Sequence, residues 1–132
     1  MQRRNISSGS QYEPVIGFSR AVVAGHHVSV SGTAPIMPEQ AEPPADAEGQ
    51  ARRVLEIILA ALAEAGAAAE HVVRTRTYLT RAEDWERVGR VHGEVFGEVR
   101  PANTIVVVSG FVESRWLIEM EADAILPEDA SR

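Results

Sequence analysis

The segment 117–126 alternates regularly between apolar and acidic residues. An alternation of period two predicts a β-strand with one buried face and one polar face. A row of carboxylates on the polar face is incompatible with an apolar layer packed over it. The sequence therefore favours a sheet that helices cover on one side only. The apolar row is Ile118, Met120, Ala122 and Ala124, and the acidic row is Glu119, Glu121 and Asp123.

Two short strands are expected earlier in the chain, at residues 21–24 and 28–31, with Gly25-His26-His27 as the turn between them. The second strand alternates valine with serine, which again predicts one apolar face. A further strand near residues 5–8 remains open. The proline-rich residues 34–48 should form an irregular surface loop, because proline removes a hydrogen-bond donor and fixes φ.

Residues 47–65 show helical spacing of apolar side chains, and Gly66 suits the end of that helix. Residues 71–80 alternate as a strand, with one side formed by Val73, Thr75, Thr77 and Leu79 and the other by Arg74, Arg76 and Tyr78. Thr80 and Glu83 have the spacing of a capping box, so a second helix is expected from there to about Gly97. Its predicted buried stripe is Trp85, Val88, His92, Val95 and Phe96.

The segment 104–108 is continuously apolar after Pro101. Such a strand is typical of the middle of a sheet, where both faces are buried. The element order then predicts a two-layer α+β domain spanning residues 1–132, with both helices on one face of a mixed sheet. Oligomerisation is expected to cover the polar face.

Net charge and composition exclude several classes of binding partner. The formal net charge is −6 and there are no cysteines. An acidic surface repels nucleic acid, and no apolar run approaches the length of a membrane-spanning helix. No apolar stretch near the amino end resembles a signal peptide, which favours a cytoplasmic location. The expected partner is therefore a small molecule, with no nucleic acid and no membrane; the spacing of His, Asp and Glu predicts no metal site.

Several short strings occur along the chain in a fixed order and spacing: Gly17-Phe18-Ser19-Arg20, Val30-Ser31-Gly32-Thr33-Ala34-Pro35, Gln50-Ala51-Arg52-Arg53, Val91-His92-Gly93-Glu94-Val95-Phe96-Gly97, Arg100-Pro101-Ala102 and Ile118-Glu119-Met120-Glu121-Ala122. In this order and spacing they resemble the RidA/YjgF (endoribonuclease L-PSP-like) family over nearly the whole chain.

The resemblance implies a chorismate-mutase-like α+β fold with a mixed six-stranded sheet, assembled as a homotrimer with small-molecule clefts between subunits. It also implies hydrolysis of imines or enamines to 2-oxo acids and ammonia without a cofactor. Some members of the family have been described as translation inhibitors or endoribonucleases, a role that the acidic charge of this chain disfavours.

Three positions depart from the family pattern. Asn103 stands where the family has the arginine that binds the substrate carboxylate, Phe18 where it has a cleft tyrosine, and Gly89 where it has a helix asparagine. A neutral amide cannot form the charged bidentate fork of arginine. We therefore expect altered specificity, with Arg20 or Arg100 as candidates for a replacement cation. The expected substrate-binding residues are Phe18, Gly32, Gly89, Asn103, Thr104, Ile105 and Arg20.

Ser31 and Glu121 are the expected catalytic residues, because the resemblance places a water-binding glutamate at Glu121. Each has an alternative interpretation. Glu121 could instead pair with Arg74 or Arg76 across the sheet, and Ser31 could only hydrogen-bond the backbone. Two functions follow: a cofactor-free hydrolase of a C=N or enamine compound, or a trimer that binds a metabolite or stabilises a partner without chemistry.

Overall fold

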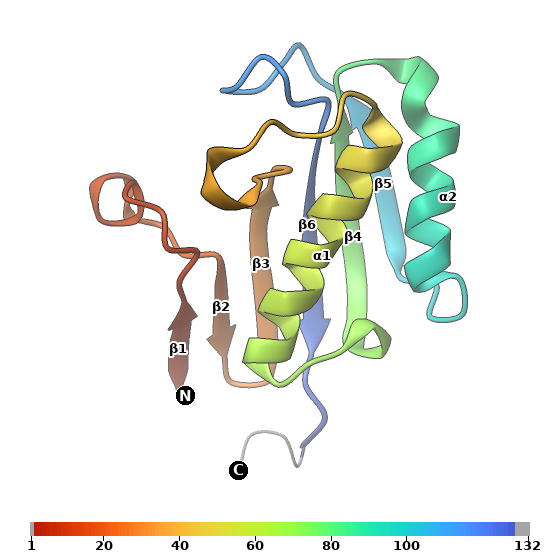
Figure 1. Ribbon diagram of the computed structural model, residues 1–132. Helices are drawn as coiled ribbons and strands as arrows, with labels where there is room; N and C mark the ends of the chain where they lie inside the picture. The colour runs from red at the N-terminus through yellow and green to blue at the C-terminus, as the bar shows by residue number, and fades with distance from the viewer. Residues whose placement is uncertain (1, 129–132) are drawn as a thin grey trace.

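The computed structural model describes residues 2–128 as one α+β unit with two layers (Figure 1). Its sheet has the strand order β1-β2-β3-β6-β4-β5, in which β4 and β5 are parallel and the other neighbours antiparallel. The strands are β1 (Arg3–Ile6), β2 (Ala21–Ala24), β3 (His27–Thr33), β4 (Val72–Leu79), β5 (Ala102–Val107) and β6 (Ile118–Ile125). The predicted two-layer α+β class with a mixed six-stranded sheet is confirmed. The strand that was left open near residues 5–8 is present as β1, which begins two residues earlier, at Arg3.

Two long helices, α1 (Ala47–Ala65) and α2 (Trp85–Phe96), cover the same face of this sheet. Asp46 caps the start of α1, since its carboxylate accepts a 2.9 Å hydrogen bond from the Gly49 backbone N–H. Gly66 ends the helix at φ 91°, in the left-handed region that favours glycine. The predicted bounds of this helix are confirmed. Short helical turns lie at Glu13–Gly17, Pro38–Gln40, Ala69–His71 and Ala82–Asp84.

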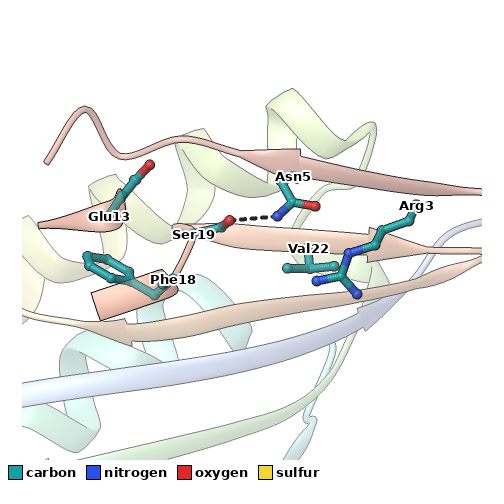
Figure 2. Close-up of a pocket in the computed structure, with 7 residues that line it drawn as sticks. Arg3, Asn5, Glu13, Phe18, Ser19 and Val22 are labelled. Atoms are coloured by element: carbon teal, nitrogen blue, oxygen red, sulfur yellow. Dashed lines mark hydrogen bonds between the residues drawn. The ribbon is translucent and has the colours of Figure 1, made fainter. Parts of the chain in front are cut away.

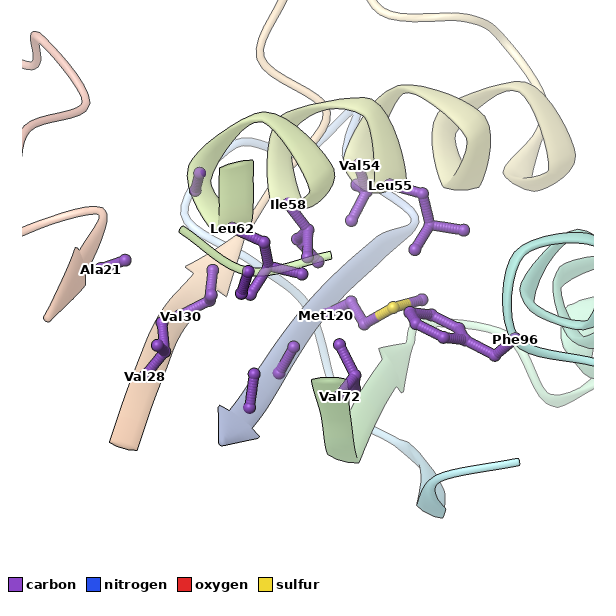
Figure 3. Close-up of a cluster of buried hydrophobic side chains, with 14 of the residues drawn as sticks. Ala21, Val28, Val30, Val54, Leu55, Ile58, Leu62, Val72, Phe96 and Met120 are labelled. Carbon is purple, nitrogen blue, oxygen red and sulfur yellow. The ribbon is translucent and has the colours of Figure 1, made fainter. Parts of the chain in front are cut away.

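The hydrophobic core lies between the two layers (Figure 3). The α1 side chains Val54, Ile58 and Leu62 are fully buried against the inward rows of β3 and β6, including Val28 and Met120. The alternation of 117–126 is confirmed, since each apolar residue of β6 from Ile118 to Ala124 points into this core. The acidic row therefore lies on the face that neither helix covers.

The predicted central position of the segment 104–108 is wrong. β5 is the last strand of the sheet and pairs only with β4. Ile105, Val106 and Val107 retain 36%, 40% and 55% of their exposure. The sequence pattern misled because an edge strand that presents apolar groups outward looks the same as a strand buried on both faces.

Three local predictions around β4 and α2 also fail. Trp85 is 56% exposed, because α2 begins there, after a 3₁₀ turn at Ala82–Asp84, and not at Thr80. The expected Thr80–Glu83 capping box is replaced by an ion pair between Arg81 Nε and Asp84 Oδ2 at 3.0 Å. Val73 is 48% exposed because the pairing of β4 with β6 shifts between Val72 and Arg74.

No helix within residues 2–128 is both long enough and apolar enough to cross a membrane.

Candidate functional site

The uncovered face of the sheet carries a network of charged side chains from β3, β4 and β6. Arg76 Nη1 lies 3.1 Å from Asp123 Oδ2 and 3.5 Å from Glu121 Oε1. The Ser29 hydroxyl donates to Asp123 at 3.2 Å. Glu121, a predicted catalytic residue, is therefore engaged with Arg76, the alternative that its cross-strand position had left open.

A β-bulge places Gly32 next to a different carboxylate, Glu119. The pairing of β3 with β6 shifts between Val30 and Thr33, so that the two residues between them oppose a single position of β6. A Cβ built on Gly32 would stand 3.0 Å from Glu119 Oε1. The bulge thus leaves space for the Glu119 carboxyl group against the Gly32 backbone.

The Arg20 side chain hydrogen-bonds to three consecutive residues of this bulge. It is only 7% exposed, and its Nη1 donates to Thr33 Oγ1 at 2.8 Å, to the Gly32 carbonyl at 3.3 Å and to Ser31 Oγ at 3.4 Å. The Ser31 hydroxyl in turn donates to the Arg20 carbonyl at 3.1 Å. Arg20 and Ser31, both predicted site residues, therefore rigidify the bulge; within residues 2–128, Arg20 Nε is left without a hydrogen-bond partner.

The electrostatics of this bulge single out Glu119. Burial is the largest effect and raises the pKa of Glu119, and the like charge of Glu121 raises it further, whereas the Arg20 guanidinium opposes the shift. A carboxyl group with a raised pKa keeps its proton to a higher pH than a free carboxyl group, which suits proton exchange with a ligand or a water. Ser31, Gly32, Arg20 and Glu119 thus form one half of a candidate site, which we call the bulge site.

The remaining predicted residues lie at the other end of the sheet, on β5 and α2. Asn103 and Ile105 are on the helix-covered side of β5, and Asn103 Nδ2 donates to Thr75 Oγ1 at 2.9 Å. Thr104 points to the opposite face, where it accepts a 2.8 Å hydrogen bond from Arg74 Nη2. Gly89 lies half-buried on α2, with open space where a Cβ would stand. We call Asn103, Ile105 and Gly89 the edge site.

A single chain does not bring the two halves together. β6 and β4 lie between β3 and β5. At about 4.8 Å per strand, Gly32 on β3 lies three spacings (roughly 14 Å) from β5, and Glu119 on β6 lies two spacings (roughly 10 Å) from it. Moreover, Asn103 faces the helix layer while Glu119 faces the uncovered side of the sheet.

Phe18 lines an open pocket of 370 Å³ beside β1 and β2 (Figure 2). The lining includes Arg3 and Glu13, and Asn5 donates to Ser19 Oγ at 2.9 Å within it. Arg3 has no ion pair with any described residue, so it is an available cation on this face. The other candidate cation, Arg100, donates to the Gly97 carbonyl at 3.1 Å in a turn where its φ is 56°.

The sequence alone did not identify Glu119 as a site residue. A bulge at Ser31-Gly32 cannot be detected in the alternation of apolar and polar residues. Arg3, which lies on the same strand face as Asn5, was also not identified. His92, a member of the predicted buried stripe of α2, is half-buried, with Nε2 2.8 Å from Thr75 Oγ1. Among residues 2–128, no cluster of three or more His, Cys, Asp or Glu could hold a metal ion.

Comparison with known sequences gives several relatives. The family model described as endoribonuclease L-PSP matches residues 9–126. An uncharacterized protein of Streptomyces coelicolor is 40% identical over 121 residues, which is 92% of this chain and 90% of the relative. A RutC family protein of Pyrococcus abyssi is 40% identical over 113 residues, covering 85% of this chain and 88% of its own.

Solved structures share the fold. A Mycobacterium tuberculosis member of the YjgF/YER057c/UK114 family superimposes with a TM-score of 0.86 at 40% identity, over 95% of this chain and 100% of that one. Escherichia coli TdcF with bound serine gives a TM-score of 0.79 at 25% identity, covering 94% of each chain. The family match, the two relatives and the shared fold agree, and the chain belongs to the RidA/YjgF family.

Proposed function

We propose that this protein hydrolyses an enamine, imine or related C=N compound without a cofactor, with a specificity altered from that implied by the family resemblance. The observation that carries the proposal is the Glu119 carboxyl group, whose pKa is raised by burial, lying against Gly32 in the bulge site. TdcF, a relative that is 27% identical, carries a provisional description as a reactive intermediate deaminase. The lack of cysteines agrees with a cytoplasmic location, which stays a prediction.

The chemistry needs one group that can both give and take a proton. Protonated Glu119 would donate to the nitrogen of the C=N bond while a water oxygen bonds to the carbon, and the proton lost by that water would return to the Glu119 carboxylate, which leaves a neutral carbinolamine. Glu119 would then donate a proton to the nitrogen again as the C–N bond breaks, and its carboxylate would take the hydroxyl proton, which releases the amine or ammonia and leaves a carbonyl. Glu121 stays a predicted participant, and its charge next to Glu119 helps to keep that carboxyl group protonated.

Clefts between the copies of a homotrimer would unite the two halves of the site. The bulge site of one copy would face the edge site of the next, which removes the separation of roughly 10–14 Å within one chain. The apolar, partly exposed β5 and the uncovered charged face of the sheet both support such an assembly. In that cleft, Phe18 and Arg3 would lie beside the ligand.

Turnover is tested with imines generated enzymatically from several amino acids and from amino acid amides, with the carbonyl product measured. We expect hydrolysis above the buffer rate, and a loss of roughly a hundredfold or more in Glu119→Gln, as is common when an acid/base group is removed. Glu121→Gln, from the same strand face, should lower the rate by less, because the charge of Glu121 only helps to keep Glu119 protonated. Rates equal to buffer with every imine would refute the hydrolase.

A binding protein without catalysis is the second candidate. It is favoured by Asn103, a neutral residue where the family resemblance places an arginine. TdcF has been crystallised with bound serine, so small-molecule binding has a precedent in the fold. Thermal-shift measurements with small carboxylates, amides and phenolics would reveal it: stabilisation by a ligand that is never turned over favours this candidate over the hydrolase.

A further inference from the structure

Three side chains form a continuous hydrogen-bond chain where α2 lies over β4 and β5. Asn103 Nδ2 is 2.9 Å from Thr75 Oγ1, and the same oxygen is 2.8 Å from His92 Nε2. Thr75 is fully buried, whereas Asn103 is exposed. The His92 ring also packs against Phe96, with a centroid distance of 4.7 Å. The chain therefore runs from a half-buried imidazole to an amide at the surface.

The direction of this chain depends on the tautomer of His92. A threonine hydroxyl has one hydrogen to donate and accepts through two lone pairs. Thr75 Oγ1 accepts from Asn103, so its own hydrogen is available to His92 Nε2. With a neutral ring whose proton is on Nδ1, Thr75 donates to Nε2; with the proton on Nε2, the ring donates to the second lone pair of Oγ1. Burial lowers the pKa of His92, which agrees with a neutral ring.

We propose that His92 and Thr75 hold the Asn103 amide with Nδ2 turned inward and Oδ1 turned outward, so that the site takes a ligand group that donates a hydrogen bond. No residue in the range 2–128 donates to Oδ1, which leaves it as the free acceptor of the edge site. An amide N–H or a protonated imine nitrogen fits such an acceptor, and a carboxylate does not. This inference rests on the proposed function, because it names the substrate class of that site.

Protonation of His92 reverses the chain. Nε2–H would then donate to Thr75 Oγ1, and the threonine hydrogen would need another acceptor. The Asn103 oxygen supplies one if the amide turns over, which places Nδ2 outward as a donor. The preference of the site should therefore move from donor groups toward carboxylates as the pH falls through the pKa of His92.

No charged neighbour within residues 2–128 contributes to the shift in the pKa of His92, although several lie on the elements around it. On β4, Arg74 and Arg76 point to the opposite face of the sheet, and β5 has no titratable residue. The charged residues on the adjoining elements are Glu48, Arg52, Arg53, Glu56 and Glu64 of α1, Glu86, Arg87, Arg90 and Glu94 of α2, and Glu70 and His71 of the turn at Ala69–His71. Burial is the single resolved cause of the His92 pKa shift.

The first test is nuclear magnetic resonance of the unliganded protein between pH 4 and 8. We expect His92 to be the Nδ1–H tautomer at pH 8, and the Asn103 side-chain amide resonances to shift with the midpoint of the His92 ring. Thr75→Val should uncouple the two titrations, while Thr77→Val, the same change at the next buried position on that strand face, should not. Asn103 side-chain resonances that do not shift as His92 titrates would overturn the proposal. A failure of turnover would leave this measurement unaffected.

The second test compares benzamide with benzoate, which differ only in the group offered to Asn103. At pH 8 we expect benzamide to bind about two- to tenfold more tightly, the worth of one hydrogen bond, and the ratio to fall as the pH drops. Thr75→Val and His92→Phe should bring the ratio close to one, and Thr77→Val should preserve it. An unchanged affinity ratio in Thr75→Val refutes the preference for donor groups. So does an absence of chemical-shift changes at the Asn103 side chain on addition of either probe.

Discussion

Glu119 Oε1 lies where a side chain at position 32 would begin, 3.0 Å from a Cβ built on Gly32. Gly32 has no positive φ, so alanine suits its backbone. Gly32→Ala should therefore fold normally but displace the carboxyl group by several tenths of an ångström or more. Misplacements approaching 1 Å cost roughly a hundredfold in rate. A hundredfold decrease is therefore the largest loss in kcat that we expect for Gly32→Ala.

The matched control for this change is Gly93→Ala, because a Cβ at Gly93 meets open space on α2. Replacing a glycine inside a helix with alanine should raise the free energy of unfolding by about 0.5–1 kcal/mol and leave turnover unchanged. Equal activity in the two variants, measured with the same imine, would show that the contact between Gly32 and Glu119 has no part in catalysis.

The raised pKa of Glu119 predicts how stability changes with pH. Below its ordinary value of 4.5, the carboxyl group is protonated in both the folded and the unfolded chain. As the pH rises toward the raised pKa, the unfolded chain loses the proton first, so the free energy of unfolding falls. Glu119→Gln lacks this titration, and its melting temperature relative to wild type should increase from pH 4 to pH 8.

Glu121→Gln provides the contrast, because it removes an ion pair with Arg76 rather than a half-buried acid. Its melting temperature relative to wild type should not show the same increase. A difference between Glu119→Gln and wild type that stays constant over the pH range would contradict the burial argument for Glu119.

The sequence predicted the elements of the fold well, because the periodicities of β6 and α1 reflect local geometry and burial on one face. It failed where position depends on partners distant in the chain. The apolar β5 reads as central, yet only the pairing of β6 between β3 and β4 decides that it lies at the edge. Trp85 reads as part of a buried stripe, yet its exposure follows from the later start of α2.

The candidate site was harder to predict for a physical reason. Alternation shows that Glu119 and Glu121 share a face, but the bulge between Val30 and Thr33 decides which of them meets Gly32. A bulge changes the register by one residue without changing composition. In the same way, the alternation placed Thr75 on the strand side opposite Arg74 and Arg76, but its hydrogen bonds to Asn103 and His92 depend on how β4, β5 and α2 pack together.

Gln50 links the start of α1 to two loops. One loop precedes α1 and the other precedes β6. Gln50 is 1% exposed; Nε2 donates to the carbonyls of Pro44 and Arg115 at 2.8 and 2.9 Å, and Oε1 accepts from the Leu117 N–H at 2.7 Å. At about 1 kcal/mol per lost hydrogen bond, Gln50→Leu should lower the free energy of unfolding by roughly 3 kcal/mol in chemical denaturation.

The ion pair between Arg52 and Glu94 makes a useful comparison, since it links α1 to α2 at 2.6 Å with both side chains about half exposed. Solvent screening limits such pairs, so Glu94→Gln should cost about 1 kcal/mol or less. A Gln50→Leu variant no less stable than Glu94→Gln would show that the buried amide does not hold the loops.

The exposed edge of the sheet gives a test of assembly that does not depend on any substrate. In the proposed trimer, Val107 of β5 lies against a neighbouring copy, so Val107→Glu would bury a charge at the interface and should yield monomers in light scattering. Val112→Glu introduces the same charge at a fully exposed residue and should leave the mass unchanged. Because the edge and bulge sites unite only between copies, the monomeric variant should also lose ligand binding. A wild-type protein that is monomeric at working concentration would remove the cleft from the proposal, whereas the Thr75–His92 hydrogen bond within each chain would stand.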